Sequence, residues 1–445
     1  MMLNRFRNHR GRLRVAADHR HLEFEDGTPF LYLGDTAWEL FHRLNREETQ
    51  YYLNNRAAKG FTVIQAVVLA ELDGINIPNS SGDLPLINHD PTTPNEAYFR
   101  HVDAVVRDAE ELGLFIGMLP SWGSGWKQEA GNDSFIFTVE NARIYGRFLG
   151  ERYRDHSVIW ILGGDRNIEH EEEYAIIESM ALGLKEGDRG AHLITFHPRG
   201  PGRSAAFLHH AEWLDFNMCQ TSHGARDHDN GLFIAQDYAL EPPKPTVDGE
   251  PRYETMPVGF YYKDVNRYDR FDDDDMRQAA YWAMLAGACG HTYGHNCVWQ
   301  MWTPDRESRL WAATPWREAL DHPGAFQMGL LRRLFQSRPF QKLLPDQTMI
   351  VDGPVSGGAK IRAARAADGT FAVVYSPRGE QFTLNKGAIQ AQRIKEFWYD
   401  PRYGSLYHFH STDNAGFQTY APPTSGRGND WVLILEDVRL NFPIP

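Results

Sequence analysis

Short apolar runs alternate with amphipathic stretches from about residue 30 to about residue 300 of this 445-residue chain. Parallel strands are buried on both faces, so they read as continuous apolar runs, and the segments that join them are usually helices. Eight such runs occur, at residues 30–38, 61–69, 114–122, 158–165, 192–197, 215–223, 245–250 and 290–295. Eight strand–helix alternations favour a (β/α)8 TIM barrel over an open sheet. A doubly wound nucleotide-binding sheet would have G-x-G-x-x-G after its first strand, and GDTAW at residues 34–38 does not fit that pattern.

The segments between the runs carry helix signals. Asn45, with Glu48 three residues later, predicts a capping box at the start of a helix that Gly60 ends. Asp275 is a candidate cap for a helix that ends near Gly290. These helices lie where a barrel requires them.

The pattern changes on both sides of the barrel. Before it, residues 21–33 read as a β-hairpin with an Asp-Gly turn, which could close the barrel floor. After about residue 340, strand candidates follow one another without helices, at residues 360–366, 370–375, 393–399, 404–409 and 431–436. We therefore expect a barrel with its hairpin over residues 1–338 and a small antiparallel β-sandwich over residues 339–445.

Composition excludes several classes of protein. The net charge of −13 disfavours a nucleic-acid partner, because phosphate binding needs a basic surface. The chain has no run of about 18 apolar residues that could cross a membrane. Its three cysteines form no C-x-x-C pair, which disfavours a zinc ribbon or a redox motif. Aromatic residues make up 13% of the chain, which suits a sugar-binding cleft as well as a large core.

The first seven residues carry charge, and no apolar stretch follows them, so the sequence as given has no signal peptide. We expect a cytoplasmic protein, or a periplasmic or secreted one if an export signal has been removed. The sequence leaves the oligomeric state open.

Two carboxylates stand out at the ends of the predicted strands. The active site of a (β/α)8 barrel lies at the carboxyl ends of its strands. Asp165 follows the fourth run and Glu250 ends the seventh, so they should face each other across the barrel mouth. Glycoside hydrolysis needs such a pair, one as acid and the other as nucleophile or base. We assign Asp165 as the acid/base and Glu250 as the nucleophile.

Other polar and aromatic side chains at the same ends are candidate substrate-binding residues: Asp35, Trp38, Trp122, His223, Arg252 and Trp299. The three tryptophans should line the mouth, while Asp35 and His223 should bond to sugar hydroxyls. Two residues beyond Glu250 on an extended strand, Arg252 would point the same way and help to keep Glu250 ionised. It could equally anchor a loop.

Structural alternatives remain open for these residues. Asp165 follows two glycines and could instead cap the helix expected at residues 168–180. Glu250 could form an ion pair that holds a loop.

We expect no metal and no cofactor. His291 and His295 are read as satisfied or sugar-binding histidines. The four aspartates at residues 272–275 lack EF-hand spacing and suggest a solvated helix start. No G-x-S-x-G motif supports serine catalysis.

Four motifs together resemble the apiosidase-like glycoside hydrolases of family 140. They are GDTAW at residues 34–38, VIWILGGDRN at 158–167, DGEPRYE at 248–254 and GHTYG at 290–294. The resemblance runs over about residues 20–335. FWYDPRYG at residues 397–404 resembles the small β-domain of the collagen-binding type that follows the barrel in that family.

The resemblance implies a retaining glycosidase that releases apiose, a branched furanose, from plant material such as rhamnogalacturonan II side chains. On that model Asp165 matches the acid/base, where the wider retaining clan has an Asn-Glu pair, and Glu250 matches the nucleophile. Because the chain as given lacks an export signal, plant-derived oligosaccharides or apiosylated glycosides are the expected substrates. The alternatives are a retaining glycosidase of other specificity, such as a β-glucanase or arabinofuranosidase, and a carbohydrate-binding barrel without catalysis.

Overall fold

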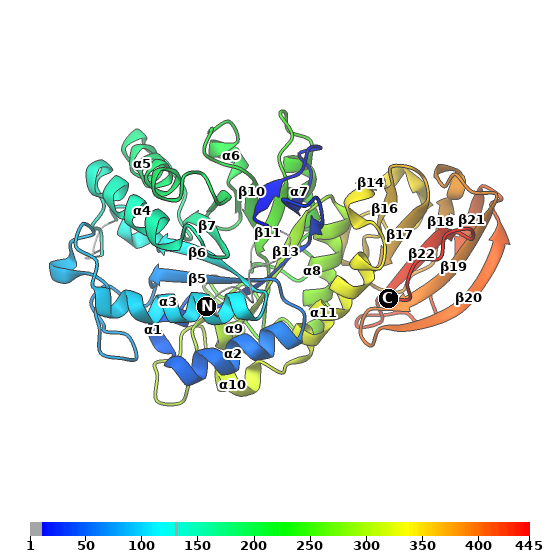
Figure 1. Ribbon diagram of the computed structural model, residues 1–445. Coiled ribbons are helices and arrows are strands. Elements are labelled where there is room, and N and C mark those ends of the chain that lie inside the picture. The colour runs from blue at the N-terminus through cyan, green and yellow to red at the C-terminus, as the bar shows by residue number, and fades with distance from the viewer. Residues whose placement is uncertain (1–10, 130–131, 133, 222) are drawn as a thin grey trace.

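The eight apolar runs form the parallel strands of one sheet, as expected for a barrel (Figure 1). The computed structural model describes residues 11–129, 132, 134–221 and 223–445. The strands, in chain order, are β4 (Tyr32–Thr36), β5 (Val63–Leu69), β6 (Phe115–Ser121), β7 (Val158–Gly163), β8 (Ile194–His197), β10 (Asn217–Gln220), β11 (Thr246–Glu250) and β13 (Gly290–His295). Their order in the sheet is β8-β7-β6-β5-β4-β13-β11-β10. The short strand β9 (Gly202–Arg203) lies antiparallel to β10, and β12 (Tyr253–Glu254) pairs with β13.

The two ends of this sheet meet between β8 and β10, so the barrel is nearly closed. The Asp215 backbone N–H donates to the Ile194 carbonyl at 2.9 Å. The Thr195 hydroxyl donates to the Phe216 carbonyl at 2.7 Å. These contacts replace a regular ladder and confirm the predicted barrel.

Helices cover the outside of the sheet. The longer ones are α2 (Arg46–Ala58), α3 (Glu96–Glu111), α4 (Val139–Tyr153), α5 (Glu171–Asp188), α7 (Gly231–Tyr238), α8 (Asp273–Leu285) and α11 (Pro323–Gln336). Four single-turn helices lie between them, α1 (Leu40–Arg43), α6 (Ala205–Leu208), α9 (Asn296–Trp299) and α10 (Trp316–Ala319). The capping box predicted at Asn45 and Glu48 is present. No helix in the described part of the chain is long and apolar enough to cross a membrane.

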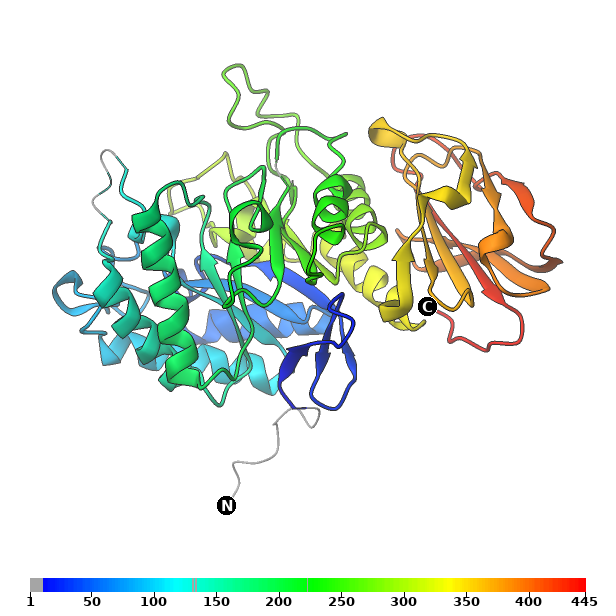
Figure 2. The same cartoon turned by 90° about the horizontal axis from the view of Figure 1, so that it is seen from above.

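The N-terminal hairpin is a three-stranded antiparallel sheet of β1 (Leu13–Val15), β2 (Leu22–Phe24) and β3 (Pro29–Phe30). Its turn contains Gly27 at φ +82°, a conformation that favours glycine. The rings of Phe24 and Phe30 lie 6.2 and 5.3 Å from the ring of Phe115, the first residue of β6. The hairpin therefore covers the amino ends of the strands, as expected (Figure 2). Residues 1–7, on which the localisation expectation rests, lie outside the described residues.

The C-terminal domain is the predicted antiparallel sandwich. One sheet has the order β14 (Leu343–Pro345), β16 (Arg362–Ala366), β17 (Phe371–Ser376), β22 (Trp431–Asp437), β19 (Arg393–Asp400), β20 (Ser405–Asp413). The other has the order β15 (Ile350–Asp352), β18 (Phe382–Asn385), β21 (Phe417–Tyr420). Phe382, Trp398, Tyr420 and Trp431 are among the buried residues that form its core.

The six-stranded sheet also packs on α8 of the barrel. Tyr281 of α8 stacks on Tyr375 with ring centroids 4.7 Å apart. Arg277 donates to buried Asp430 at 2.8 Å, and the Trp282 indole donates to the Lys360 carbonyl at 2.9 Å. Barrel and sandwich thus share one apolar core and a buried ion pair.

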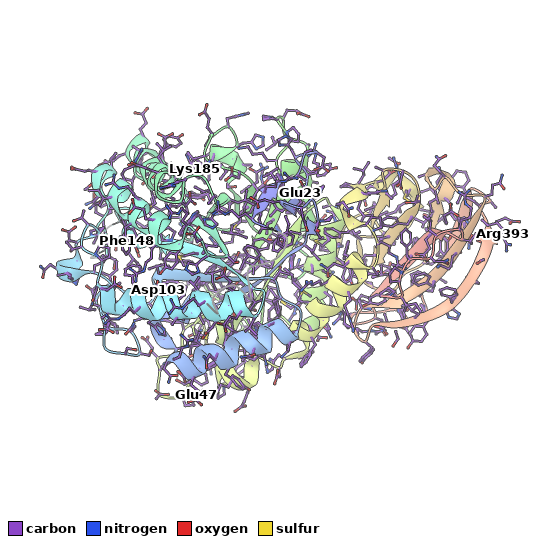
Figure 3. The ribbon with its side chains drawn as sticks, in the orientation of Figure 1. Glu23, Glu47, Asp103, Phe148, Lys185 and Arg393 are labelled. Carbon is purple, nitrogen blue, oxygen red and sulfur yellow. The ribbon has the colours of Figure 1, made fainter. Side chains whose placement is uncertain are left out.

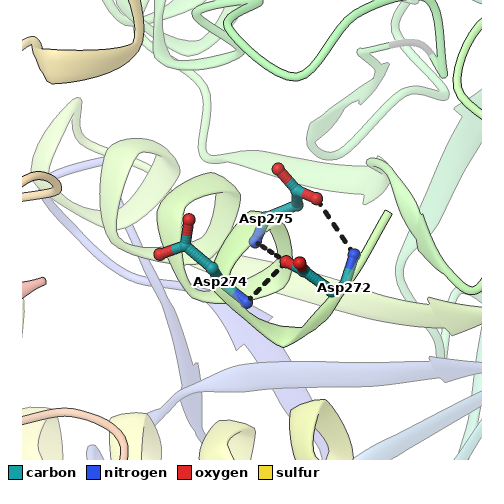
Figure 4. Close-up of side chains that lie close together, drawn as sticks. All are labelled: Asp272, Asp274 and Asp275. Atoms are coloured by element: carbon teal, nitrogen blue, oxygen red, sulfur yellow. Dashed lines mark hydrogen bonds between the residues drawn. The ribbon is translucent and has the colours of Figure 1, made fainter. Parts of the chain in front are cut away.

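The acidic start of α8 belongs to this interface (Figure 4). Asp272, rather than the expected Asp275, is the N-cap, and its carboxylate accepts from the Asp274 and Asp275 backbone N–H groups. Asp274 and Asp275 are buried, so the expectation of a solvated helix start is wrong. Arg427 of the sandwich reaches Asp272 at 2.7 Å and Asp275 at 2.9 Å. Arginines from distant segments therefore neutralise the cluster.

Glycines allow α4 and α5 to approach closely. A Cβ at Gly183 would lie 2.3 Å from the Arg143 carbonyl oxygen, and one at Gly150 would lie 2.4 Å from the Leu184 carbonyl oxygen. Any side chain at these positions pushes the two helices apart.

We expect Gly183→Ala to destabilise the protein by about 1–3 kcal/mol, because the overpacking outweighs the better helix propensity of alanine. Urea denaturation measures the effect. Leu182→Ala, at the neighbouring exposed position, is the matched control and should change stability by no more than about 0.5 kcal/mol. A Gly183→Ala protein as stable as the parent would show that the helices separate without cost.

Candidate active site

A cavity of about 980 Å³ opens at the carboxyl ends of the barrel strands. Six of the eight residues predicted for the site line it: Trp38, Trp122, Asp165, His223, Glu250 and Trp299. They come from segments spread over most of the barrel sequence, and the sheet order brings them together. Asp35 and Arg252 do not line it.

A β-bulge on β11 directs Glu250 into this cavity. Cys219 pairs with Asp248 and Gln220 pairs with Glu250, so Gly249 is the extra residue on β11. Asp248 accepts from Asn230, next to the outer helix α7, whereas Glu250 lines the cavity. Without the extra residue both carboxylates would follow the same face of the strand. A Cβ at Gly249 would lie 2.5 Å from the Met218 side chain, so any other residue there would force that side chain to move.

Two histidines hold Glu250 in its ionised form. His223 Nε2 lies 3.1 Å from Glu250 Oε1, and His197 Nε2 lies 3.0 Å from Oε2 in an ion-pair contact that is not aligned as a hydrogen bond. Burial alone would raise the pKa of Glu250, but the two imidazoles outweigh it and lower that pKa to about 2. Glu250 is therefore an anion at neutral pH although it is buried.

His197 connects the two carboxylates. The Asp165 backbone N–H donates to His197 Nδ1 at 3.3 Å. Since Nδ1 accepts this bond, His197 carries a proton on Nε2, the nitrogen that lies 3.0 Å from Glu250 Oε2.

Asp165 lies in a different electrostatic environment from Glu250. Burial, followed by the negative charge of Glu250, raises the pKa of the Asp165 carboxyl above its ordinary value. Its side chain remains partly exposed, and the nearest guanidinium, that of Arg166, is 3.7 Å away. The pair thus combines an ionised group with a group that keeps its proton to higher pH.

The helix-capping alternative for Asp165 is wrong. The N-cap of α5 is His170, five residues further along. Gly163, Gly164 and Asp165 all have positive φ, at 94°, 96° and 59°. This turn places Asp165 at the cavity, and its second glycine is required because a Cβ there would lie 2.9 Å from the Gly123 nitrogen.

Aromatic rings form much of the cavity wall. Trp38 and Trp122 lie against each other with ring centroids 5.4 Å apart, and the rings of His197 and Trp38 form a T-shaped pair with centroids 5.4 Å apart. Tyr261 and Trp311 line the outer part and are 49% and 39% exposed. A bound sugar would therefore meet ring faces inside the cavity and at its mouth.

The expected role of Asp35 does not match its position. Asp35 is fully buried and accepts from Arg56 Nε at 2.7 Å and from the Tyr52 hydroxyl, both on α2. Its side chain points out of the barrel toward that helix, so it ties α2 to β4 and does not reach the cavity.

The prediction that Arg252 points the same way as Glu250 into the cavity is also wrong. β11 ends at Glu250 and Pro251 follows, so the strand alternation does not continue to Arg252. Arg252 Nη1 instead donates to Gln278 of α8 at 3.1 Å, and the guanidinium is buried. It is the loop anchor that the sequence left as its alternative.

Of the other histidines at the strand ends, His295 is satisfied as expected, but His291 is not, because its buried Nδ1 has no hydrogen-bond partner in the described part of the chain. His295 accepts from the Cys297 backbone N–H at 3.0 Å and contacts His322 at 3.0 Å. His291 lies 3.8 Å from Asp248 in the barrel wall. Among the described residues, the one group with metal-like spacing is Asp272, Asp274 and Asp275, which the arginines already neutralise.

The charged or ionisable residues at the site that the sequence prediction missed include His197 and Glu71, as well as Arg199 and Arg309 in the cavity lining. His197 ends the fifth apolar run, and a strand-ending histidine was a usable signal because His223 was chosen on similar grounds. Glu71 lines the cavity from the loop after β5. It lies two residues beyond its strand, where no periodicity indicates the direction of a side chain.

We expect His223→Phe to raise the pKa of Glu250 from about 2 by about one unit or more, because the ring can no longer bond to the carboxylate. A 13C NMR titration of protein labelled at the glutamate carboxyl measures the shift. His210→Phe, at an exposed position, is the control and should leave this resonance unchanged. An unaltered Glu250 pKa in His223→Phe would contradict the electrostatic assignment.

Comparisons with known proteins agree with this geometry. A family model described as "Apiosidase-like, catalytic domain" matches residues 16–342, and one described as "Putative collagen-binding domain of a collagenase" matches residues 344–436. A solved glycoside hydrolase is 33% identical, with 98% of each chain covered and a TM-score of 0.89. A glycoside hydrolase family 5 protein from Bacteroides vulgatus is 30% identical over 98% of this chain and 95% of that one, with a TM-score of 0.89. No curated protein matches the sequence significantly.

The catalytic-domain model covers well over half of the chain. Both solved relatives are described as glycoside hydrolases, and the match covers nearly the whole of each. This protein therefore belongs to the apiosidase-like glycoside hydrolases.

Proposed function

We propose that this protein is a retaining glycosidase of family 140 in which Asp165 is the acid/base and Glu250 the nucleophile. The observation that carries the proposal is the contrast between the two carboxyl groups in one cavity. Glu250 is held ionised by two imidazoles, while Asp165 is held protonated to higher pH by burial and by Glu250. A retaining glycosidase requires these two states at the start of its reaction.

The reaction would proceed in two steps. Asp165 gives its proton to the glycosidic oxygen as that bond breaks, and Glu250 forms a covalent bond to the anomeric carbon. The negative charge of Glu250 is then lost, so the pKa of Asp165 falls. In the second step water attacks the anomeric carbon, the bond to Glu250 breaks and restores its carboxylate, and Asp165 accepts the proton of the water. Throughout, the His197 and His223 contacts would fix the orientation of the Glu250 carboxylate.

The substrate that best fits the family is a β-apioside. The description of the matched family supports apiose as the released sugar, and plant-derived oligosaccharides or glycosides, including rhamnogalacturonan II side chains, as the source. The exposed rings of Tyr261 and Trp311 suit an aglycone that extends out of the cavity. The relative described as a family 5 glycoside hydrolase favours a second candidate, a retaining enzyme of other specificity. Hydrolysis rates on nitrophenyl β-apioside, β-glucoside and arabinofuranoside decide between the two.

We expect Asp165→Ala and Glu250→Ala to differ in their substrate dependence. Asp165→Ala should lose about 10²–10⁴-fold on substrates with poor leaving groups but much less on a nitrophenyl glycoside, which departs without a proton. Added azide should partly restore the release of the sugar from the covalent intermediate of Asp165→Ala. Glu250→Ala should be inactive on every substrate, because no covalent intermediate can form. The measurement is kcat and kcat/KM of each variant on both kinds of substrate.

Glu47→Gln, on the exposed face of α2, is the control for these variants (Figure 3). It should retain full activity on all substrates. Equal losses for Asp165→Ala and Glu250→Ala on activated and unactivated substrates would refute the division of roles.

The pH profile of kcat/KM should be broad on the acid side. Glu250 must be ionised, so activity falls only as pH drops toward its pKa of about 2, provided the fold persists. Asp165 must be protonated, so activity falls as pH rises through its raised pKa. On a nitrophenyl glycoside, the activity of Asp165→Ala should no longer fall as the pH rises through the pKa of Asp165. A wild-type acid limb near pH 5 would be inconsistent with the His197 and His223 contacts.

A further inference from the structure

We propose that Glu71 is a specificity-determining residue that hydrogen-bonds to hydroxyl groups of the sugar held next to Asp165 and Glu250. This inference rests on the proposed function and adds a third carboxyl group to the same cavity. It assigns to Glu71 a contact with substrate and no part in bond cleavage.

The position of Glu71 supports the proposal. It lies two residues beyond β5, which is flanked in the sheet by β4 and β6, the strands that precede Trp38 and Trp122. The Trp122 backbone N–H donates to the Leu69 carbonyl at 3.2 Å, which joins the ends of β5 and β6. Glu71 thus belongs to the cavity wall beside the tryptophan pair.

The loop that carries Glu71 is held by buried groups behind it. Glu39 is fully buried, and its Oε1 accepts from the Leu72 backbone N–H at 2.9 Å. Its other oxygen contacts His42 Nδ1 at 2.7 Å, and His42 Nε2 lies 3.1 Å from the Ile77 carbonyl. Both ends of the loop are fixed by this pair, so Glu71 is presented in a defined place.

The carboxyl group of Glu71 has no partner for hydrogen bonding among the described residues, in contrast to Glu250 and its two histidines. The other charges around the cavity do not supply one. Burial, followed by the neighbouring carboxyl groups of Asp165, Glu39 and Glu250, raises the pKa of Glu71 well above its ordinary value, and Arg166 opposes this only in part. Glu71 is only partly buried at the cavity wall, so its carboxyl group is open to a ligand that enters the cavity.

The chemistry of a carboxyl group identifies that ligand. Its oxygens accept hydrogen bonds, and when it is protonated its O–H donates one. A pair of neighbouring sugar hydroxyls offers the matching acceptor and donor. An anionic ligand group would be repelled by the ionised Glu250. Glu71 would therefore select neutral sugars that carry hydroxyls at the position it reaches.

The test compares Glu71→Ala with Glu71→Gln on the nitrophenyl glycoside that the wild-type enzyme hydrolyses fastest. Glutamine keeps a donor and an acceptor in the same place, so Glu71→Gln should stay within about 5-fold of wild-type kcat/KM. Alanine removes both, and kcat/KM should fall by about 10²-fold or more. Asp73→Asn, an exposed position in the same loop, is the matched control and should behave as wild type. Unfolding temperatures of all variants confirm that each is folded.

Substrates that lack one glycon hydroxyl provide the second measurement. Wild type should discriminate against at least one deoxy analogue by about 10-fold or more, and Glu71→Ala should lose that discrimination. Retained discrimination in Glu71→Ala, or a kcat/KM equal to that of wild type, would overturn the inference while leaving the roles of Asp165 and Glu250 intact.

Two further outcomes separate this inference from the proposed function. If azide rescues Glu71→Ala and not Asp165→Ala, then Glu71 is the acid/base and both this inference and the Asp165 assignment fail. If wild type hydrolyses no glycoside, the proposed function fails, and calorimetric binding of the free monosaccharides then tests Glu71 directly. Weaker binding by Glu71→Ala than by Asp73→Asn would support the contact, and equal binding would overturn it.

Discussion

An ionised carboxylate buried at the barrel mouth is the constraint on which this site depends. Burial favours the neutral acid, so an anion at Glu250 requires groups that repay the lost hydration. His197 and His223 do so, and each comes from the end of a different strand. Their arrangement requires that β8, β10 and β11 hold their register, and that Gly249 supply the bulge which turns Glu250 inward. The nearly closed sheet therefore keeps Glu250 ionised by holding the two histidines next to it.

The charge on Glu250 adds to the effect of burial on the other carboxyl groups in the cavity. Asp165 and Glu71 share the cavity with it, and the pKa of each is raised partly by its negative charge. One strongly stabilised anion therefore leaves its neighbours protonated at higher pH than an isolated carboxyl would be. Burial and the charge of Glu250 together thus place carboxyl groups with different pKa values in one cavity.

The sandwich domain, which the structure describes throughout, does not supply residues to the cavity, but it packs on a helix that supports the cavity wall. It packs on α8, the helix that lies between β11 and β13 in the chain, through Tyr281, Arg277 and the aspartates of the helix start. Buried Arg252 reaches the same helix through Gln278. The strand that carries Glu250 is therefore braced by α8, and α8 is braced by the sandwich. Loss of the domain would remove partners from two buried aspartates and one buried arginine, which is costly.

The sequence by itself determined the number and order of the barrel strands, the sandwich that follows them, the capping box at Asn45 and the presence of most site residues at strand ends. These features follow from local rules, namely apolar runs, helix caps and the place of the active site in a barrel. The tertiary structure alone decided which way the side chains point where those rules stop. Asp35 faces α2 because it forms an ion pair with Arg56 of that helix. Arg252 points to α8 because its strand ends at Glu250, so the strand alternation no longer sets its direction. The bulge at Gly249, the bridge made by His197, and the arginines that neutralise the start of α8 all depend on residues far apart in the chain. Such contacts are set by strand register and helix packing, which no local pattern encodes.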